Sequence, residues 1–238
     1  MEKPWYYTLI DFREIIAPKY LNKIKPLFFK KNDVIYSPKD RSDCIYVVSS
    51  GIVKIFSITA SGKETSMSLR FPGEIFGLAE VFGGCRYCFA GAYKDATVYP
   101  IKKDQLIKMI DEKPEIAVKI IEFLGKRLIE KEIHIEHSVE KNVEARVAHL
   151  LVKMAIQEGE YYKDDFVKIN FKMTHQTIAD LVGASRQTVT EILNNLENKG
   201  VIILTNREIQ IKDLRALALH GRTKFDIKDI ERIKESKP

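Results

Sequence analysis

The sequence predicts an α+β protein in which a small β-roll is followed by one long helix and then by short helices closed by a β-hairpin. Three successive residue patterns along the 238 residues indicate this arrangement. Short β-rich segments with glycine turns fill residues 26–100. A helical pattern without a strong breaker runs on from Lys113, and beyond Ala145 short helical segments lead to two short apolar strands.

The composition is typical of a folded, water-soluble protein. Hydrophobic residues make up 45% of the chain and charged residues 30%, which is too few charges for a disordered chain. Residues 1–6 lack the basic and apolar stretches of a signal peptide, and no apolar run is long enough for a membrane span. Three cysteines make no disulfide framework, so we expect a cytoplasmic protein. The net charge of +6 fits a nucleic-acid partner, but many proteins without one share it.

The N-terminal part predicts a short helical opening over residues 7–20, followed by strands and turns. The strand segments are 44–48, 52–56 and 64–71, and the breaks are 49–51, the hairpin tip 60–63 and Pro72-Gly73. We therefore expect a turn at 49–51 that separates two strands.

A long helix is predicted from Pro114, because a proline in the first turn and the acidic neighbour Glu115 are start signals. An apolar seam recurs every three to four residues along it, although Lys131 and Ser138 interrupt the seam. Its members are Ala117, Ile121, Leu124, Leu128 and Ile135. The seam either packs on the helix's own domain or joins two copies of the chain. Joining of two copies is favoured, because a helix of this length extends beyond the surface that a small roll can cover.

Residues 173–196 carry the most specific pattern, two helices joined by a tight turn. Thr174 can cap the first helix and Ser185 the second, while Gly183 can take the positive φ of the turn without strain. The apolar residues that would bury the inner faces are Ile178, Leu181, Val182, Val189, Ile192, Leu193 and Leu196. A hairpin over 202–211 and a helix over 213–220, capped by Asp213, complete a winged helix-turn-helix.

The second helix keeps a polar outer side in its first turns, as expected of a helix that enters the major groove of DNA. Arg186 can bind guanine in a bidentate manner, and Gln187 can bind adenine. The residues expected at bases or phosphates are Thr174, His175, Gln176, Ser185, Arg186, Gln187, Thr188, Thr190 and Glu191. A helical hairpin that binds no DNA is the alternative. The spacing, the caps, the outward polar set and the following hairpin together favour DNA binding.

This helix-turn-helix resembles that of the catabolite activator and fumarate-nitrate regulator family of bacterial transcription factors. Residues 44–56, the hairpin at 61–64, the stretch from Phe71-Pro72-Gly73 to Gly77 and the helix from Pro114 match the family in order and spacing. The resemblance implies a cyclic-nucleotide-binding-type β-roll, a long dimerisation helix and a C-terminal winged helix-turn-helix. It also implies a homodimer that binds palindromic double-stranded DNA and contacts RNA polymerase. We accordingly expect an effector-sensing β-roll domain at 1–112, the dimerisation helix at 113–141, the DNA-binding domain at 142–221 and a charged tail at 222–238.

The cyclic-AMP site of the family is largely absent. Leu78 follows Gly77, where cyclic-AMP binders have a glutamate. Arg86-Tyr87 stands in place of their Arg-Ser pair, and Lys131-Glu132 replace the Thr-Ser pair of the long helix. One of the three features survives, so we do not expect cyclic AMP as the effector.

Other sensing chemistries find limited support. Three cysteines, none before Cys44, cannot supply the four ligands of an iron–sulfur cluster. The haem sensors of the family have a cysteine and a histidine where Gly77 and Ala79 stand, and haem held by other ligands stays open. Cys85 and Cys88 could hold a metal or form a redox disulfide, but two thiols beside a buried strand is the favoured interpretation.

Two arginines suggest a different effector. If Arg86 and Arg127 face one apolar pocket, their guanidinium groups would suit a carboxylate or phosphate. Alternatively, Arg127 is solvated or pairs with the other subunit. The expected effector pocket consists of Gly77, Leu78, Arg86, Tyr87, Arg127 and Lys131. The effector and any cofactor stay unknown: a small anion is the hypothesis, and a redox- or haem-responsive regulator is the alternative.

No nucleophile elbow, Walker loop or zinc-protease motif is present, so we do not expect an enzyme. His134 and His137 lie three apart on the long helix, where a solvated face is expected rather than a metal site. Another alternative is that the helix-turn-helix domain serves for contacts with other proteins. The outward Arg186 and Gln187 disfavour it. Glu191 stands where many relatives carry a base-reading arginine, so we expect a different half-site, with this carboxylate accepting from cytosine N4.

Overall fold

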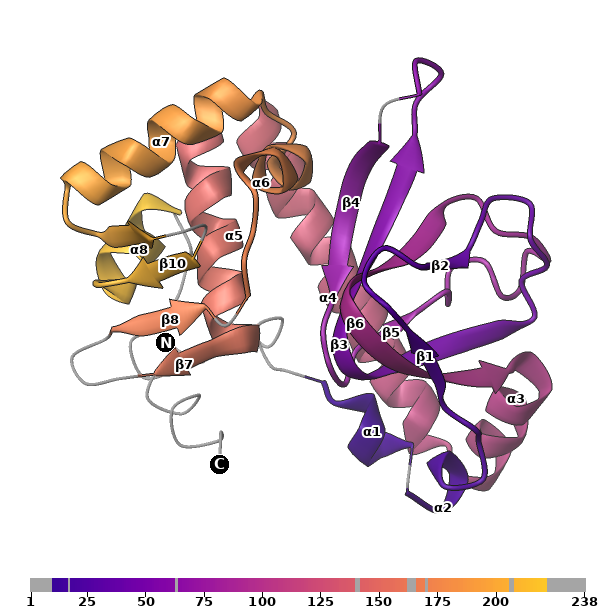
Figure 1. Ribbon diagram of the computed structural model, residues 1–238. Coiled ribbons are helices and arrows are strands. Elements are labelled where there is room, and N and C mark those ends of the chain that lie inside the picture. The colour runs from indigo at the N-terminus through magenta and orange to yellow at the C-terminus, as the bar shows by residue number, and fades with distance from the viewer. Residues whose placement is uncertain are drawn as a thin grey trace. The chain divides into compact units, whose positions relative to one another are not determined.

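The computed structural model describes residues 10–16, 18–62, 64–139, 142–161, 166–169, 171–205 and 208–221. The chain forms two compact units, which divide inside the long helix α4 (Glu115–Val139) after Gly125 (Figure 1). The expected charged tail at 222–238 and the start of the expected helical opening lie outside the described residues.

The N-terminal unit is built on a six-stranded antiparallel sheet that runs in the order β1-β6-β3-β4. Its strands are β1 (Leu27–Phe29), β2 (Val34–Tyr36), β3 (Cys44–Ile58), β4 (Glu64–Arg70), β5 (Ile75–Phe76) and β6 (Phe89–Lys102). The long pair β3 and β6 forms the centre of this roll, while β2 pairs with β6 and β5 with β3. The expected hairpin tip does separate β3 from β4.

The expected turn at 49–51 is wrong, because β3 continues through these residues as one strand. The register between β3 and β6 shifts around Ser50, and Gly51 has a φ of +78°. A Cβ atom at Gly51 would lie 1.9 Å from the carbonyl oxygen of Asp95 on β6. The small polar residues therefore mark a β-bulge, where the partner backbone comes too close for a side chain.

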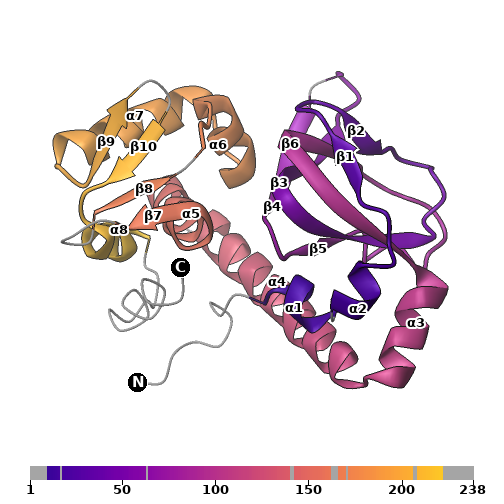
Figure 2. The same ribbon diagram turned by 60° about the horizontal axis from the view of Figure 1, so that its bottom comes forward.

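Three helices and the start of α4 close one end of the roll (Figure 2). They are α1 (Phe12–Ile15), α2 (Pro18–Leu21) and α3 (Lys103–Glu112). Phe12 of α1 meets Phe123 of α4 edge to face at 5.4 Å between ring centroids, within a buried apolar cluster that includes Ile45, Ile101 and Leu106. The single helical opening expected up to residue 20 is instead two short helices, because Pro18 lacks the amide N–H that would continue the first.

The C-terminal unit combines the end of α4 and four further helices with a small sheet. Besides the end of α4, the helices are α5 (Val143–Glu158), α6 (His175–Val182), α7 (Arg186–Asn198) and α8 (Leu214–His220). The sheet runs β7-β8-β10-β9, from β7 (Gly159–Tyr161), β8 (Val167–Ile169), β10 (Glu208–Ile211) and β9 (Ile202–Thr205). The hairpin of β9 and β10 was expected, whereas β7 and β8 were missed because three residues are too few to show a strand period.

One side of α4 is apolar and exposed. Ile116 and Phe123 are buried in the N-terminal unit, but Ile121, Leu128 and Ile135 are 68%, 62% and 61% exposed. These three recur every seven residues, with Val118 and Leu124 exposed beside them. We call these five residues the α4 stripe. Among the described helices, none is both long and apolar enough to cross a membrane.

Candidate nucleic-acid interface

Helix α6 begins and ends at the residues that the sequence indicated. The Thr174 hydroxyl accepts a hydrogen bond from the Thr177 amide at 3.0 Å, as an N-cap does. Gly183 takes the left-handed conformation with a φ of 65°, and its amide bonds back to the last turn of the helix. The tight turn between the two helices is therefore confirmed.

Helix α7 follows after three residues and is capped in the same way. The Ser185 hydroxyl accepts from the Thr188 amide at 3.0 Å, and Arg186 is the first helical residue. Val189, Leu193 and Leu196 are buried beneath the helix. An apolar underside at this spacing fixes which side of α7 turns outward.

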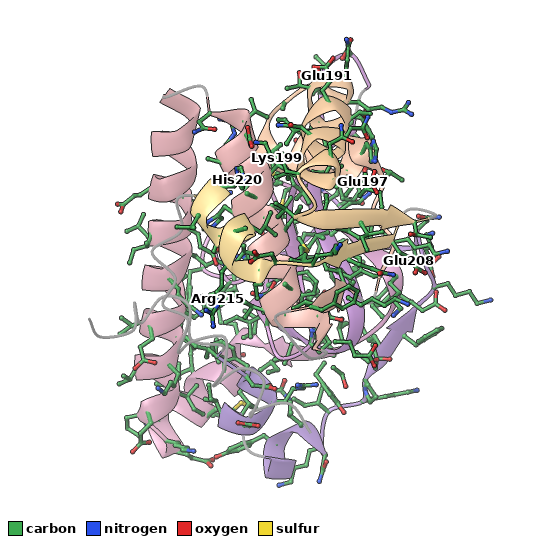
Figure 3. The ribbon with its side chains drawn as sticks, turned by 90° about the vertical axis from the view of Figure 1, so that its left-hand side faces the viewer. Glu191, Glu197, Lys199, Glu208, Arg215 and His220 are labelled. Carbon is green, nitrogen blue, oxygen red and sulfur yellow. The ribbon has the colours of Figure 1, made fainter. Side chains whose placement is uncertain are left out.

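The outer side of α7 carries the expected polar set. Arg186, Gln187 and Glu191 are exposed, while Thr188 and Thr190 are half-buried. The Gln187 amide nitrogen Nε2 donates to Glu191 Oε1 at 3.1 Å. Because a carboxylate only accepts hydrogen bonds, this pair leaves the Gln187 carbonyl oxygen as an acceptor beside the acidic group. Figure 3 marks Glu191 on this helix.

A second hydrogen-bonded pair joins the start of α6 to α7. His175 Nδ1 lies 2.8 Å from Thr190 Oγ1, and the Thr190 hydroxyl donates to the Arg186 carbonyl oxygen at 2.9 Å. Burial and the nearby Arg186 charge lower the pKa of His175. The other residues expected at phosphates, Thr174 and Gln176, are exposed.

Two side chains that the sequence analysis did not single out hold this motif in place. Buried Arg146 on α5 donates from Nε to the Val182 carbonyl oxygen at the end of α6, at 2.7 Å. Glu197 at the end of α7 accepts from the Leu204 amide of β9 at 2.7 Å, which ties the hairpin to the helix (Figure 3). No local pattern signals either contact, since both partners are distant in the sequence or in another element.

Arg86, expected in the effector pocket, lies inside the N-terminal unit with 2% exposure. Its Nη1 donates to the Gly77 carbonyl at 2.9 Å and lies 3.2 Å from Glu80 Oε2, while Nη2 donates to the Cys44 carbonyl. Its guanidinium carbon is 4.4 Å from the centre of the Tyr36 ring. Protein groups therefore surround this guanidinium on several sides.

Glu80 is the residue of this cluster that the sequence analysis missed. Besides Arg86, it accepts from the Tyr87 amide at 3.0 Å and from the Cys88 thiol at 3.4 Å. The Tyr87 ring itself is exposed, and Leu78 packs on the apolar cluster at the end of the roll. Gly77 and Tyr87 are thus brought together around the Glu80–Arg86 pair, whereas Leu78 packs against the core.

Arg127 and Lys131 belong to the C-terminal unit, where Lys131 is exposed. Arg127 Nη1 lies 2.9 Å from Glu130 Oε2, and Lys153 of α5 bonds both oxygens of the same carboxylate at 2.9 Å. Burial alone would raise the pKa of Glu130, but the charges of Lys153 and Arg127 outweigh it and hold that pKa well below its usual range. Glu130 therefore joins α4 to α5 as a carboxylate.

The three cysteines are free; Cys85 is exposed, while Cys44 and Cys88 are buried. Burial and the neighbouring Glu80 raise the pKa of Cys88 to about 11, so this thiol stays protonated at neutral pH. No group of three or more potential metal ligands occurs in the part of the chain that the structure describes. The side chains of His134 and His137 lie outside that part.

The fold and this site define a class of protein: a DNA-binding protein in which a β-roll domain is joined through a long helix to a winged helix-turn-helix. Residues 26–113 match the cyclic nucleotide-binding domain family, and residues 145–219 match the Crp-like helix-turn-helix domain family. The chain belongs to the CRP/FNR family of DNA-binding transcription regulators.

Relatives agree with this assignment over most of the chain. The CRP-like cAMP-activated global transcriptional regulator of Mycobacterium tuberculosis is 27% identical and covers 84% of this chain and 89% of its own. The global nitrogen regulator of Synechococcus elongatus is 26% identical and covers 88% and 95%. A CRP/FNR transcriptional regulator of Thermus thermophilus has a solved structure with 26% identity, a TM-score of 0.68 and coverage of 84% and 100%. These relatives are transcription regulators and not enzymes.

Proposed function

We propose that the protein is a cytoplasmic homodimeric regulator that reads palindromic double-stranded DNA with α7 and recruits or blocks RNA polymerase in response to an effector bound by the β-roll domain. One observation carries the proposal. Helix α7 is capped at Ser185, buried along its underside, and polar at Arg186, Gln187 and Glu191 on its outer side. A helix of this kind presents its first turns to base edges in the major groove.

Base recognition is assigned to the exposed residues of α7. Arg186 is a donor that suits guanine O6 and N7. The Gln187–Glu191 pair presents acceptor oxygens, which suit the exocyclic amino groups of cytosine or adenine. A half-site in which a guanine stands next to a cytosine or an adenine therefore fits this surface. Thr174, Gln176, Ser185 and Thr188, at the two helix starts, are assigned to phosphates.

Dimerisation is assigned to the α4 stripe. Ile121, Leu128 and Ile135 repeat at the seven-residue interval of a coiled-coil seam, and they are exposed in the single chain. A contiguous apolar face of this kind on a long helix favours pairing with another copy. A two-fold dimer would present two α7 helices to the two halves of a palindrome.

The effector is proposed to be other than cyclic AMP. Leu78, which takes the place of the ribose-binding glutamate, packs into the apolar cluster, and Arg86 already pairs with Glu80. A small anion remains the proposed class, with Gly77, Arg86 and Tyr87 of the β-roll domain as its site. An anion that uses Arg86 would have to replace Glu80. The high pKa of Cys88 disfavours this thiol as a redox sensor, which weakens the alternative of a redox-responsive regulator.

Two experiments test these assignments. Selection from a random duplex library should enrich a palindrome, and sedimentation should show two chains on each enriched duplex. Failure to enrich any duplex, or one chain on a non-palindromic site, would overturn the proposed function. Native mass spectrometry and absorbance of the purified protein test the effector: a retained small anion supports the proposed class, whereas a haem spectrum or a bound metal would replace it.

A further inference from the structure

The hydrogen bonds around His175 fix where its proton lies. A threonine hydroxyl has one proton, and the Thr190 hydroxyl gives it to the Arg186 carbonyl oxygen. The contact of 2.8 Å between His175 Nδ1 and Thr190 Oγ1 must then be donated by the ring. In the neutral imidazole, Nδ1 therefore carries the proton and Nε2 has a lone pair.

His175 lies among the residues of the proposed DNA-binding surface. His175 is half-buried, and within the described residues its only hydrogen-bond contact is that of Nδ1 with Thr190. It follows the exposed cap Thr174 and precedes the exposed Gln176, and its partner Thr190 lies one turn beyond Arg186. His175 thus stands beside the residues assigned to phosphates, with its Nε2 left to bind one.

We propose that His175 takes up a proton when the protein binds DNA and donates it from Nε2 to a backbone phosphate, so that DNA affinity rises as the pH falls. This inference rests on the proposed function. In the neutral ring, Nε2 is an acceptor, and so is a phosphate oxygen. No hydrogen bond can therefore form between these two atoms. The protonated ring offers a charged donor, and its bond from Nδ1 to Thr190 is the same in both states.

The charges around the ring account for its state in the free protein. Arg186 on α7 acts on the ring and, together with burial, keeps the pKa of His175 low. Three further charged groups on α6 and the helices packed against it have partners of their own. Arg146 of α5 bonds to Val182 at the far end of α6, Asp180 of α6 bonds to Gln176, and Glu191 of α7 bonds to Gln187. A phosphate beside Nε2 would oppose the Arg186 charge and raise the pKa of His175.

The direction of the pH effect follows from the difference between the pKa of His175 in the free protein and its pKa in the DNA complex. Because the pKa is lower in the free protein than in the complex, binding takes up protons between the two values. Affinity therefore increases as the pH falls through the pKa of the complex, and it levels off below the pKa of the free protein. One unit of difference corresponds to about a tenfold change in affinity per half-site. Since phosphates carry no sequence, the effect should appear on any duplex.

Fluorescence anisotropy between pH 5.5 and 8.5 at constant ionic strength tests this. The probes are a duplex enriched by the wild-type protein and a scrambled duplex of the same length. We expect binding to both probes to be several-fold tighter at pH 6 than at pH 8. His175→Asn, which keeps a donor near Thr190 and does not titrate, should flatten the profile. The matched control His220→Asn removes the imidazole that pairs with Glu144 on α5, and it should keep the wild-type slope.

An unchanged slope in His175→Asn would overturn the inference while leaving DNA binding intact. If that variant does not fold, the pKa of His175 in the wild-type protein, followed by NMR with and without the duplex, decides the question. A higher pKa in the complex supports the proton uptake, and equal values overturn it. Absence of binding to every duplex at every pH would instead overturn the proposed function.

Discussion

Glu80 and Arg86 form an ion pair inside the β-roll domain, with 3.2 Å between Oε2 and Nη1 and side-chain exposures of 5% and 1%. Each charge is taken out of water and relies on the other, on the Gly77 and Cys44 carbonyls, and on the Tyr87 amide. The sequence suggests that Arg86 binds an effector anion. In the structure, Arg86 is already paired with the carboxylate of Glu80.

The first prediction concerns this pair. Glu80→Gln removes the countercharge and leaves a buried guanidinium, so we expect a loss of about 3–5 kcal/mol in the free energy of unfolding. Glu64→Gln, which breaks the exposed pair with Lys54, should cost less than about 1 kcal/mol. Chemical denaturation of both variants measures the difference. Equal stabilities would mean that the Glu80 charge is not needed.

The second prediction concerns base recognition by Arg186. Arg186→Ala should weaken binding to the selected duplex by about 1–3 kcal/mol and relax the preference at one position of each half-site. Arg215→Ala on α8 removes the same charge from the same domain and should change only the general electrostatic attraction. Anisotropy on a set of single-base variants measures both. A loss for Arg186→Ala that is equal on all sequences would contradict its role at a base.

The third prediction concerns the α4 stripe. Leu128→Lys places a charge in the proposed seam, and we expect sedimentation to show single chains where the wild-type protein forms dimers. Affinity for the palindrome should fall with dimerisation, because each chain then binds one half-site alone. Ile58→Lys, at another exposed apolar position at the end of β3, is the control and should leave the dimer intact. A dimer that survives Leu128→Lys would place the interface elsewhere.

The fourth prediction concerns the carboxylate that joins α4 to α5. Because the folded state holds the pKa of Glu130 below its usual 4.5, this group stabilises the protein at pH values above 4.5. That stabilisation is lost as the pH falls through the folded-state pKa. Glu130→Gln should therefore reduce stability by about 1.5–3 kcal/mol at pH 7, with a smaller difference from wild type in acid.

Unfolding curves between pH 3 and 7 check this dependence. Glu122→Gln, which affects the exposed pair with Lys119 on the same helix, should show a much smaller difference at every pH. A Glu130→Gln difference that does not vary with pH would show that the lost charge is not the cause.

The DNA-binding motif could be predicted from the sequence because its determinants are local. Thr174 and Ser185 bond amides three residues away, and Gly183 needs only its own freedom to adopt a positive φ. The periodic apolar residues of α7 likewise decide its buried side without reference to distant parts of the chain. These features, and the start of α4 after Pro114, follow from neighbours within one or two turns.

What only the tertiary structure decided depends on residues far apart in the chain. In the sequence, Gly51 indicates a turn, but in the fold it lies against Asp95 of β6 as part of a β-bulge. Likewise, β7 and β8 become strands only because they pair with each other and β8 pairs with β10. In the same way, Glu130 acquires its role from Lys153 of another helix. The stability of a strand register or a buried charge depends on which group lies across from it, and the fold brings that group there from elsewhere in the sequence.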